Sequence, residues 1–310
     1  GCSSLTEIEI HSYVTTIENY VFYDCKSLIR IVIPSSVKSI ENYAFGKCSS
    51  LNSLIEIGSN SFNECTSLTE IIIPQSVNFI RDEAFNKCTS LKHIEISSSI
   101  KKIYPKTFNE CRSLTEIKIP SSVTLIDTEA FNGCTSLKEI TIPLSVMTIK
   151  DKAFSGCSSL SSIVIPSSVI SVGSEAFNGC SSLKNVTILS AMTTFGSSIF
   201  NGVKCLEITG ILREVHNNMF LNCKELTQIS LPQTVTLIGV NAFRNCSSLK
   251  EIIIPPYVTA IRECAFMGCS SLIYIAIPYS VVYFGSKIFK DIKSLTINGD
   301  LTRIPQNCFQ

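Results

Sequence analysis

Cysteine is the residue type that this sequence places most regularly where chemistry could occur. The chain has fifteen cysteines, and most follow one another at steps of 23 residues. A thiol can form a disulfide, bind a metal or act as a nucleophile. A fixed period, however, puts each cysteine at the same point of a repeated structural unit. The periodic cysteines are Cys2, Cys25, Cys48, Cys65, Cys88, Cys111, Cys134, Cys157, Cys180, Cys223, Cys246 and Cys269.

Two interpretations of this cysteine column stay open. Parallel coils stack about 5 Å apart, which is within bridging distance for disulfides. Stacked cysteines, however, point the same way into the core, whereas a disulfide needs converging Cβ vectors. We favour a ladder of reduced, buried thiols that pack as small hydrophobic side chains.

Three cysteines lie off the column, at positions 205, 264 and 308. Our alignment of the repeats puts Cys264 and Cys308 in place of a core alanine and predicts that both are buried. It puts Cys205 where Ser182 lies in another repeat, which predicts an exposed thiol. The redox state of these three is left open.

The sequence predicts no catalytic residue, no metal ligand set and no cofactor. It contains no Cys-x-x-Cys pair, and its three histidines, His11, His93 and His216, belong to repeats far apart in the chain. No Gly-rich phosphate-binding loop follows a strand pattern. Charge is sparse and balanced, with 26 basic and 25 acidic residues and no basic run, so nucleic acid is not expected as a partner. No apolar stretch is long enough to insert into a membrane.

The elements that position these residues are short strands. The unit from Cys111 to Gly133 carries Leu-x-x-Ile-x-Ile-Pro, then Val-x-x-Ile, then Ala-Phe. The first stretch alternates with period two, which predicts a strand with one buried face, and the proline ends it. Val-x-x-Ile predicts a second short extended piece. Because Phe131 and Cys134 are three residues apart, we expect a short helix or 3₁₀ turn there.

One such coil buries too little surface to fold alone, so neighbouring coils must stack on it. The sequence therefore predicts a repeat solenoid: a leucine-rich-repeat horseshoe with a parallel sheet on its concave side and short extended or helical-turn segments on its convex side. A column of phenylalanines spans residues 22–309 without a linker, which predicts a single array of about fourteen coils over residues 1–310. Short coils are expected near 48–64, 203–222 and 292–310.

These columns resemble those of the BspA-like class of leucine-rich repeats over the whole chain. The class shares the 23-residue order Leu-x-x-Ile-x-Ile-Pro-x-x-Val-x-x-Ile-x-x-x-Ala-Phe-x-x-Cys. Its members include surface proteins of host-associated bacteria and parasitic protozoa that are described as adhesins. The resemblance implies a binding function, but the motif is structural and implies no binding residue.

The outward positions of the Leu-x-x-Ile-x-Ile strands are the candidate ligand site, because a solenoid commonly binds partners on its concave face. Acidic residues gather there in the N-terminal and middle coils, where a basic partner would relieve their repulsion. The alternative is that Lys92, Lys118 and Lys138 already neutralise them. The candidate residues are Glu70, His93, Glu95, Glu116, Lys118 and Glu139.

Four tyrosines form a second candidate contact patch near the C-terminus. Tyrosine contributes large contact area at small entropic cost. The alternative is that tyrosine is simply tolerated in strands and at the loop rim. The residues are Tyr257, Tyr274, Tyr279 and Tyr283.

Two functions follow from these patterns. The first is a non-enzymatic, cell-surface or secreted adhesin that binds a protein or a glycan, and the alternative is an intracellular, cytoplasmic interaction scaffold. The first residues read like Gly268 to Leu272, so the chain begins inside a repeat and a signal sequence could precede it. Neither end shows an obvious polar cap, so self-association through a terminal coil is expected.

Overall fold

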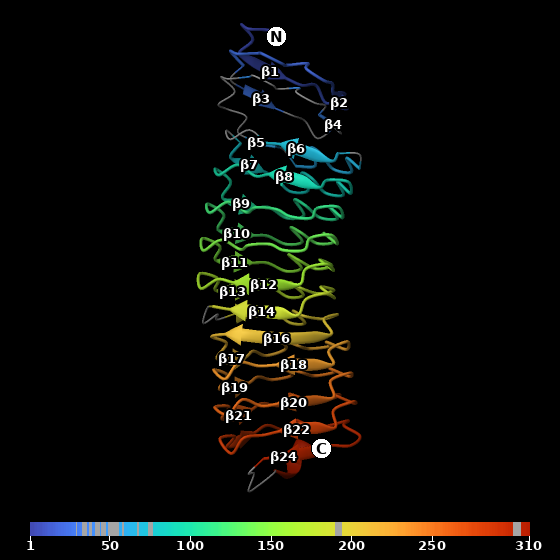
Figure 1. Cartoon of the computed structure of the whole chain (residues 1–310), viewed down its shortest axis with the longest axis vertical. Helices are drawn as coiled ribbons and strands as arrows, with labels where there is room; N and C mark the ends of the chain where they lie inside the picture. Colours follow the sequence, from blue (N-terminus) through green and yellow to red (C-terminus); the bar gives the residue numbers. More distant parts are fainter. Residues whose placement is uncertain are drawn as a thin grey trace. The chain divides into compact units, whose positions relative to one another are not determined.

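A computed structural model gives the structure of the chain (Figure 1). It describes residues 1–28, 30–32, 36, 39–40, 44, 48, 56–57, 59–66, 68–73, 77–189, 194–299 and 305–310. The chain divides into two compact units, unit 1 (Gly1–Ser145) and unit 2 (Val146–Gln310). Both are β-solenoids of stacked parallel coils, so the predicted repeat fold is confirmed.

Unit 1 carries two sets of parallel strands. The Leu-x-x-Ile-x-Ile stretches form the first sheet, in which β1 pairs with β3 and β6 with β8, and it continues as isolated bridges from Glu95 to Lys118 and from Lys118 to Thr141. The Val-x-x-Ile pieces form the second sheet, in which β2 pairs with β4, β5 with β7 and β9 with β10. The strands are β1 (Glu7–Glu9), β2 (Thr16–Ile17), β3 (Arg30–Val32), β4 (Ser39–Ile40), β5 (Glu56–Ile57), β6 (Glu70–Ile72), β7 (Phe79–Ile80), β8 (His93–Glu95), β9 (Lys102–Ile103) and β10 (Leu125–Ile126).

Unit 2 repeats this plan. The strands of its first sheet follow the orders β12-β14-β16-β18 and β20-β22-β24. In its second sheet, β13 pairs with β11 and with β15, and the remaining strands follow the order β17-β19-β21-β23. The strands are β11 (Thr148–Ile149), β12 (Ser162–Ile165), β13 (Ser171–Val172), β14 (Asn185–Ile188), β15 (Thr194–Phe195), β16 (Cys205–Gly210), β17 (Glu214–Val215), β18 (Gln228–Ser230), β19 (Leu237–Ile238), β20 (Glu251–Ile253), β21 (Ala260–Ile261), β22 (Tyr274–Ala276), β23 (Tyr283–Phe284) and β24 (Thr296–Asn298).

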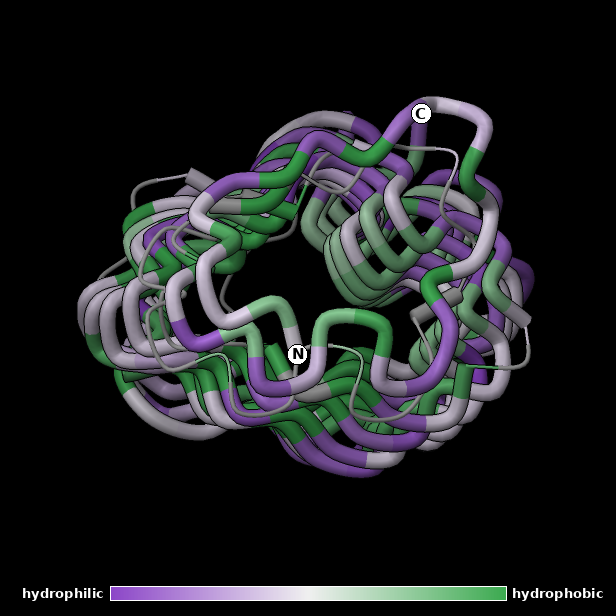
Figure 2. The backbone as a smooth tube through the Cα atoms, turned by 90° about the horizontal axis from the view of Figure 1, so that it is seen from above, coloured by the Kyte–Doolittle hydropathy of each residue, from purple (hydrophilic) through white to green (hydrophobic). Residues whose placement is uncertain are grey.

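The core of each unit consists of side-chain columns that run from coil to coil. Within each unit, hydrophobic and hydrophilic positions recur at the same places around successive coils (Figure 2). The phenylalanine rings stack almost parallel, with centroids 5.6 Å apart between Phe85 and Phe108 and 5.2 Å apart between Phe243 and Phe266. Because every coil supplies one ring, the stack holds neighbouring coils in register. Three predicted core or strand-end residues lie outside the described residues: Pro34, Phe45 and Pro74. The short coils predicted at 48–64 and 292–310 lie partly outside them.

The Ala-Phe-x-x-Cys stretch forms tight turns that are closed by hydrogen bonds between residues three apart. Of the two expected forms, the described residues show the 3₁₀-type turn and no continuous short helix. Cys111 N–H donates to the Phe108 carbonyl and Asn109 N–H to the Lys106 carbonyl, as in successive turns. Lys106 and Glu110 are left-handed, with φ of 53° and 56°, which interrupts any helical run. Phe108 N–H instead donates to the carbonyl of Ala130 in the next coil. In the described part of the chain, the one 3₁₀ helix is Gln306–Cys308.

Candidate functional site

The six charged candidates of unit 1 lie together on the outer face of the first sheet, and we call them the acidic strip: Glu70, His93, Glu95, Glu116, Lys118 and Glu139. Strand alternation puts Glu70, His93 and Glu95 outward, and Glu116, Lys118 and Glu139 hold the corresponding positions of the next two coils. All six side chains are exposed. Glu70 is the register partner of His93, and Glu95 bridges to Lys118. The sheet therefore aligns residues that are 23 positions apart in the chain.

The acidic strip carries uncompensated negative charge. It holds four carboxylates against one ammonium group and one imidazole. Among the described residues, the one such pair within it joins His93 Nδ1 to Glu116 Oε1 at 3.6 Å, which is an ion pair when the imidazole is protonated. Lys92, Lys118 and Lys138, the lysines considered as neutralising neighbours, form no ion pair with other described residues.

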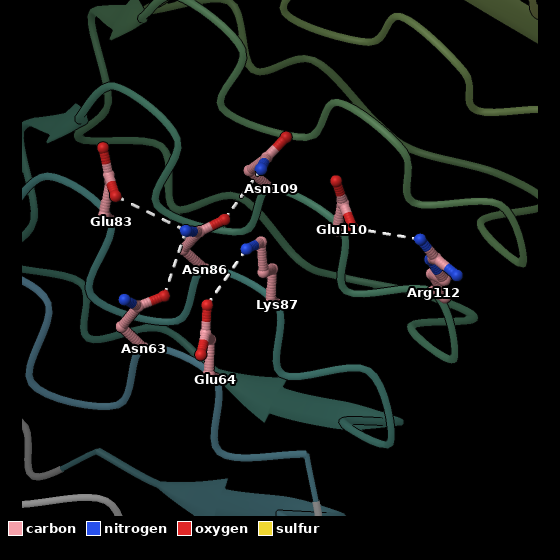
Figure 3. Close-up of polar contacts among 8 residues, drawn as sticks. All are labelled: Asn63, Glu64, Glu83, Asn86, Lys87, Asn109, Glu110 and Arg112. Carbon is pink, nitrogen blue, oxygen red and sulfur yellow. Dashed lines mark hydrogen bonds and ion pairs between the residues drawn. The ribbon is translucent and has the colours of Figure 1, made fainter.

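Charges on the turns of the same unit are arranged differently (Figure 3). Lys87 Nζ lies 3.0 Å from Glu64 Oε1, and this hydrogen bond raises the pKa of the lysine. Asn109 Nδ2 donates to Asn86 Oδ1 at 2.7 Å, as one step of an asparagine ladder. These polar groups have partners in the adjacent coil, so they stabilise stacking. The acidic strip has one such pair between adjacent coils, His93 with Glu116, and its other three carboxylates have no ion-pair partner among the described residues.

The four tyrosines are distributed over two sheets and the loops between them. Tyr274, on β22, accepts a hydrogen bond from Asn298 Nδ2 at 3.0 Å. Tyr283, on β23 of the second sheet, donates to Glu263 Oε1 at 2.7 Å, which raises the pKa of Tyr283 and lowers that of Glu263. Tyr257 and Tyr279 lie in the loops that join the sheets, with 66% and 78% of their surface exposed. Two rings are thus held by polar partners, and two are open to solvent.

Ten of the twelve periodic cysteines are buried as free thiols, as in the ladder that we favoured, whereas Cys2 is exposed and Cys48 is partly buried. Cys111 Sγ donates to the Phe85 carbonyl oxygen at 3.1 Å, and Cys246 Sγ donates to that of Phe220 at the same distance. Each of these thiol protons therefore has a backbone acceptor. Burial raises the pKa of Cys111 and of Cys180 to about 12, so these thiols stay protonated and unreactive at neutral pH.

The off-column cysteines require one correction. Cys308 is fully buried, and Cys205 is exposed, both as predicted. The Phe289 N–H donates to the carbonyl oxygen of Cys308, as Phe108 does to that of Ala130, which shows that Cys308 takes the alanine position. Cys264 does not replace the core alanine, since Ala265 is the fully buried residue. Cys264 instead occupies a left-handed turn position, with φ of 56°, and is only partly buried. Our alignment was one residue out at this repeat.

A hollow at β16 escaped the sequence analysis. It has a volume of about 320 Å³ and lies on the outer face of the first sheet of unit 2. It forms where the 20-residue coil between Phe200 and Phe220 changes the strand register. The signal in the sequence was that short coil, whose Leu-Glu-Ile-Thr-Gly replaces the proline segment. The lining residues are Lys184, Asn185, Cys205, Leu206, Glu207, Gln228 and Ser230.

The part of the chain that the structure describes contains no cluster of metal-binding side chains and no membrane-spanning helix. There, no three side chains of His, Cys, Asp and Glu come together as a metal site. The same residues contain no helix long and apolar enough to cross a membrane.

Comparisons with known proteins agree with this architecture. A family model described as a BspA type leucine-rich repeat region matches residues 1–55, 49–160, 101–223 and 213–310. A leucine-rich repeat protein from Bacteroides ovatus is 31% identical, with a TM-score of 0.69, over 97% of this chain and 85% of its own.

Two further solved structures are more distant. A leucine-rich cell surface protein from Faecalibacterium prausnitzii is 29% identical, with a TM-score of 0.45, over 96% of this chain and 80% of its own. The pneumococcal vaccine antigen PcpA is 23% identical, with a TM-score of 0.48, over 83% and 77%. No curated protein sequence matches the chain.

Proposed function

Because the chain belongs to the BspA-type leucine-rich-repeat family, whose repeats are generally non-catalytic binding modules, we propose that it is a binding protein that presents the acidic strip of unit 1 to a basic segment of a partner protein. The observation that carries this proposal is the excess of carboxylates over basic groups in the strip. Four carboxylates project from adjacent coils, and like charges so placed repel one another by roughly 1 kcal/mol in an aqueous setting. A lysine-rich or arginine-rich segment would relieve that repulsion.

The proposal includes an adhesin-type role at the cell surface or in secreted form. Its support is the resemblance of the repeats to those of surface proteins from host-associated bacteria and parasitic protozoa. Antibody labelling of intact cells, compared with lysed cells, tests the location. Labelling of lysed cells alone would reject the surface role.

The second candidate is an intracellular interaction scaffold, and the cysteine ladder favours it. Cys88, Cys111 and Cys246 all use their thiol protons in hydrogen bonds to backbone carbonyls. Structural thiols of this kind suit a reducing compartment, where disulfides are rare.

The acidic strip is tested by the binding of a lysine-rich peptide and of immobilised extracellular-matrix proteins to the purified chain. We expect saturable binding of the basic ligands that weakens about tenfold or more in a Glu116→Lys, Glu139→Lys variant. We also expect it to weaken between about 50 and 500 mM salt, because exposed charges are screened.

Glu251→Lys is the matched control, since Glu251 is an exposed glutamate on β20 of the same kind of sheet in unit 2. Equal loss of binding in this control would indicate a non-specific charge effect and would reject the strip as the site. Unchanged binding in the double variant would reject it as well.

A further inference from the structure

The hollow at β16 arises from a shift in strand register within unit 2. Toward the N-terminus, Asn185 of β14 pairs with Glu207, but toward the C-terminus Glu207 pairs with Ser230 of β18 and Cys205 pairs with Gln228. The β16 strand thus directs one more side chain outward than either neighbour. The row that contains Cys205 and Gln228 has no paired residue on β14, and the surface is hollowed there.

The side chains around this hollow have complementary polar chemistry. Cys205 Sγ lies 3.4 Å from Thr227 Oγ1, whereas Lys184, Asn185, Glu207 and Gln228 have no side-chain partner among the described residues. Lys184 supplies an ammonium group and Glu207 a carboxylate, yet neither forms an ion pair with another described residue. The amides of Asn185 and Gln228 add donors and acceptors from the flanking strands. Elsewhere in unit 2 such groups pair between coils, as in the Asn245 to Asn222 hydrogen bond of 2.9 Å. The hollow therefore has unused hydrogen-bonding capacity that converges from three strands.

We propose that this hollow is a binding subsite for one acidic sugar residue of a glycan, a ring that carries a carboxylate beside vicinal hydroxyl groups. Lys184 binds the sugar carboxylate. Glu207 and the two amides bind neighbouring hydroxyls, since a carboxylate or an amide can engage two adjacent hydroxyl groups at once. The volume of about 320 Å³ suits a single small ring, at the lower end of the usual range for ligand sites.

The surface around the hollow favours a sugar chain over an isolated small molecule. Thr187 and Thr209 lie outward on β14 and β16, with their hydroxyl oxygens 2.9 Å apart, and Ser230 lies on the other side on β18. These neutral hydroxyl groups extend the polar surface across the sheet. No aromatic ring lines the hollow, so affinity rests on hydrogen bonds and one charge contact, which predicts weak, millimolar binding.

The test uses the full 310-residue chain and saturation-transfer NMR with D-glucuronate, D-glucose and glycine as probes. We expect saturable binding of glucuronate, weaker binding of glucose because it lacks the carboxylate, and no competition by glycine. Lys184→Gln and Glu207→Gln should each weaken glucuronate binding about tenfold or more, the usual effect of losing one charged hydrogen bond.

Lys138→Gln is the matched control, because Lys138 occupies the same repeat position as Lys184, two periods earlier, beside a strand with no register shift. It should bind glucuronate like the unmodified chain, and circular dichroism should show that all variants remain folded. Glucuronate binding that is absent, or equal in the Lys184→Gln variant, overturns the proposal. Equal competition by glycine would also overturn it and would assign the hollow to amino acids or peptide termini.

The proposals for the acidic strip and for the hollow can fail independently of each other. The strip lies in unit 1 and is tested with basic ligands, whereas the hollow lies in unit 2 and is tested with an acidic sugar. A result on one therefore leaves the other intact.

Discussion

Cysteine thiols in this chain differ in reactivity because the coil buries some and exposes others. Cys180 is fully buried, and its pKa is raised to about 12 chiefly by desolvation. In the next coil Val203 takes the same column position and is equally buried. The column therefore requires a small apolar side chain, which a protonated thiol or a valine supplies equally well.

Alkaline pH should destabilise the fold through these thiols. The pKa of Cys180 rises from an ordinary value of 9.0 when unfolded to about 12 when folded. The stability that the protonated Cys180 thiol contributes to the folded chain is therefore complete below pH 9 and is lost as pH rises toward 12, because only the unfolded chain then releases the proton. Each such thiol should cost roughly 2 kcal/mol of stability by about pH 10.5.

Cys180→Val isolates this effect, since valine is native to the column. Urea unfolding at pH 7.5 and 10.5 should show that the variant loses less stability with pH than the parent chain, by roughly 2 kcal/mol. Parallel losses in the two proteins would contradict the assignment of the alkaline transition to buried thiols.

At the scale of the element, β16 shows how a shorter coil alters a sheet. Gly210 ends this strand with φ of +94° and pairs with Ile188. A Cβ atom at Gly210 would collide with the carbonyl oxygen of Ile188. Glycine at this position is what allows the short coil to turn without the proline segment and so to shift the register.

Gly210→Ala should therefore destabilise the chain by about 1–3 kcal/mol, because it combines an unfavourable backbone conformation with a backbone collision. Denaturant unfolding measures the loss. Gly179→Asn is the control: Gly179 has φ of +73° and no contact closer than 3.5 Å to an added Cβ, and asparagine occupies the same column at Asn222 and Asn245. The control should lose less than about 0.5 kcal/mol. An equal loss in both variants would show that β16 has no special requirement for glycine.

At the scale of the whole molecule, the repeat period continues between the two units, since Cys134 and Cys157 are 23 residues apart. We propose that residues 1–310 form one array of about fourteen coils. In such an array each coil is stabilised mainly by its neighbours. Phe309 packs against Phe289 with centroids 5.4 Å apart yet keeps 51% of its surface exposed.

The exposed ring of Phe309 predicts self-association of the 310-residue chain. Light scattering of the 310-residue chain should show a mass that rises from monomer toward dimer with concentration, and Phe309→Asp should weaken the association several-fold. A mass that stays at that of one chain over a wide concentration range would rule this out.

The sequence by itself determined the coil, its two strands and the residues that fill its core, because burial repeats with the coil and leaves a readable period. Glu116 and Glu139 could be placed on the outer face for the same reason. The left-handed turns at Lys106 and Glu110 could not be predicted from the sequence, since their backbone N–H groups donate hydrogen bonds to carbonyl groups of the next coil. Only the tertiary structure revealed the register shift at β16: a slip of two residues keeps every side chain on its original face, so the hydrophobic pattern is the same before and after it.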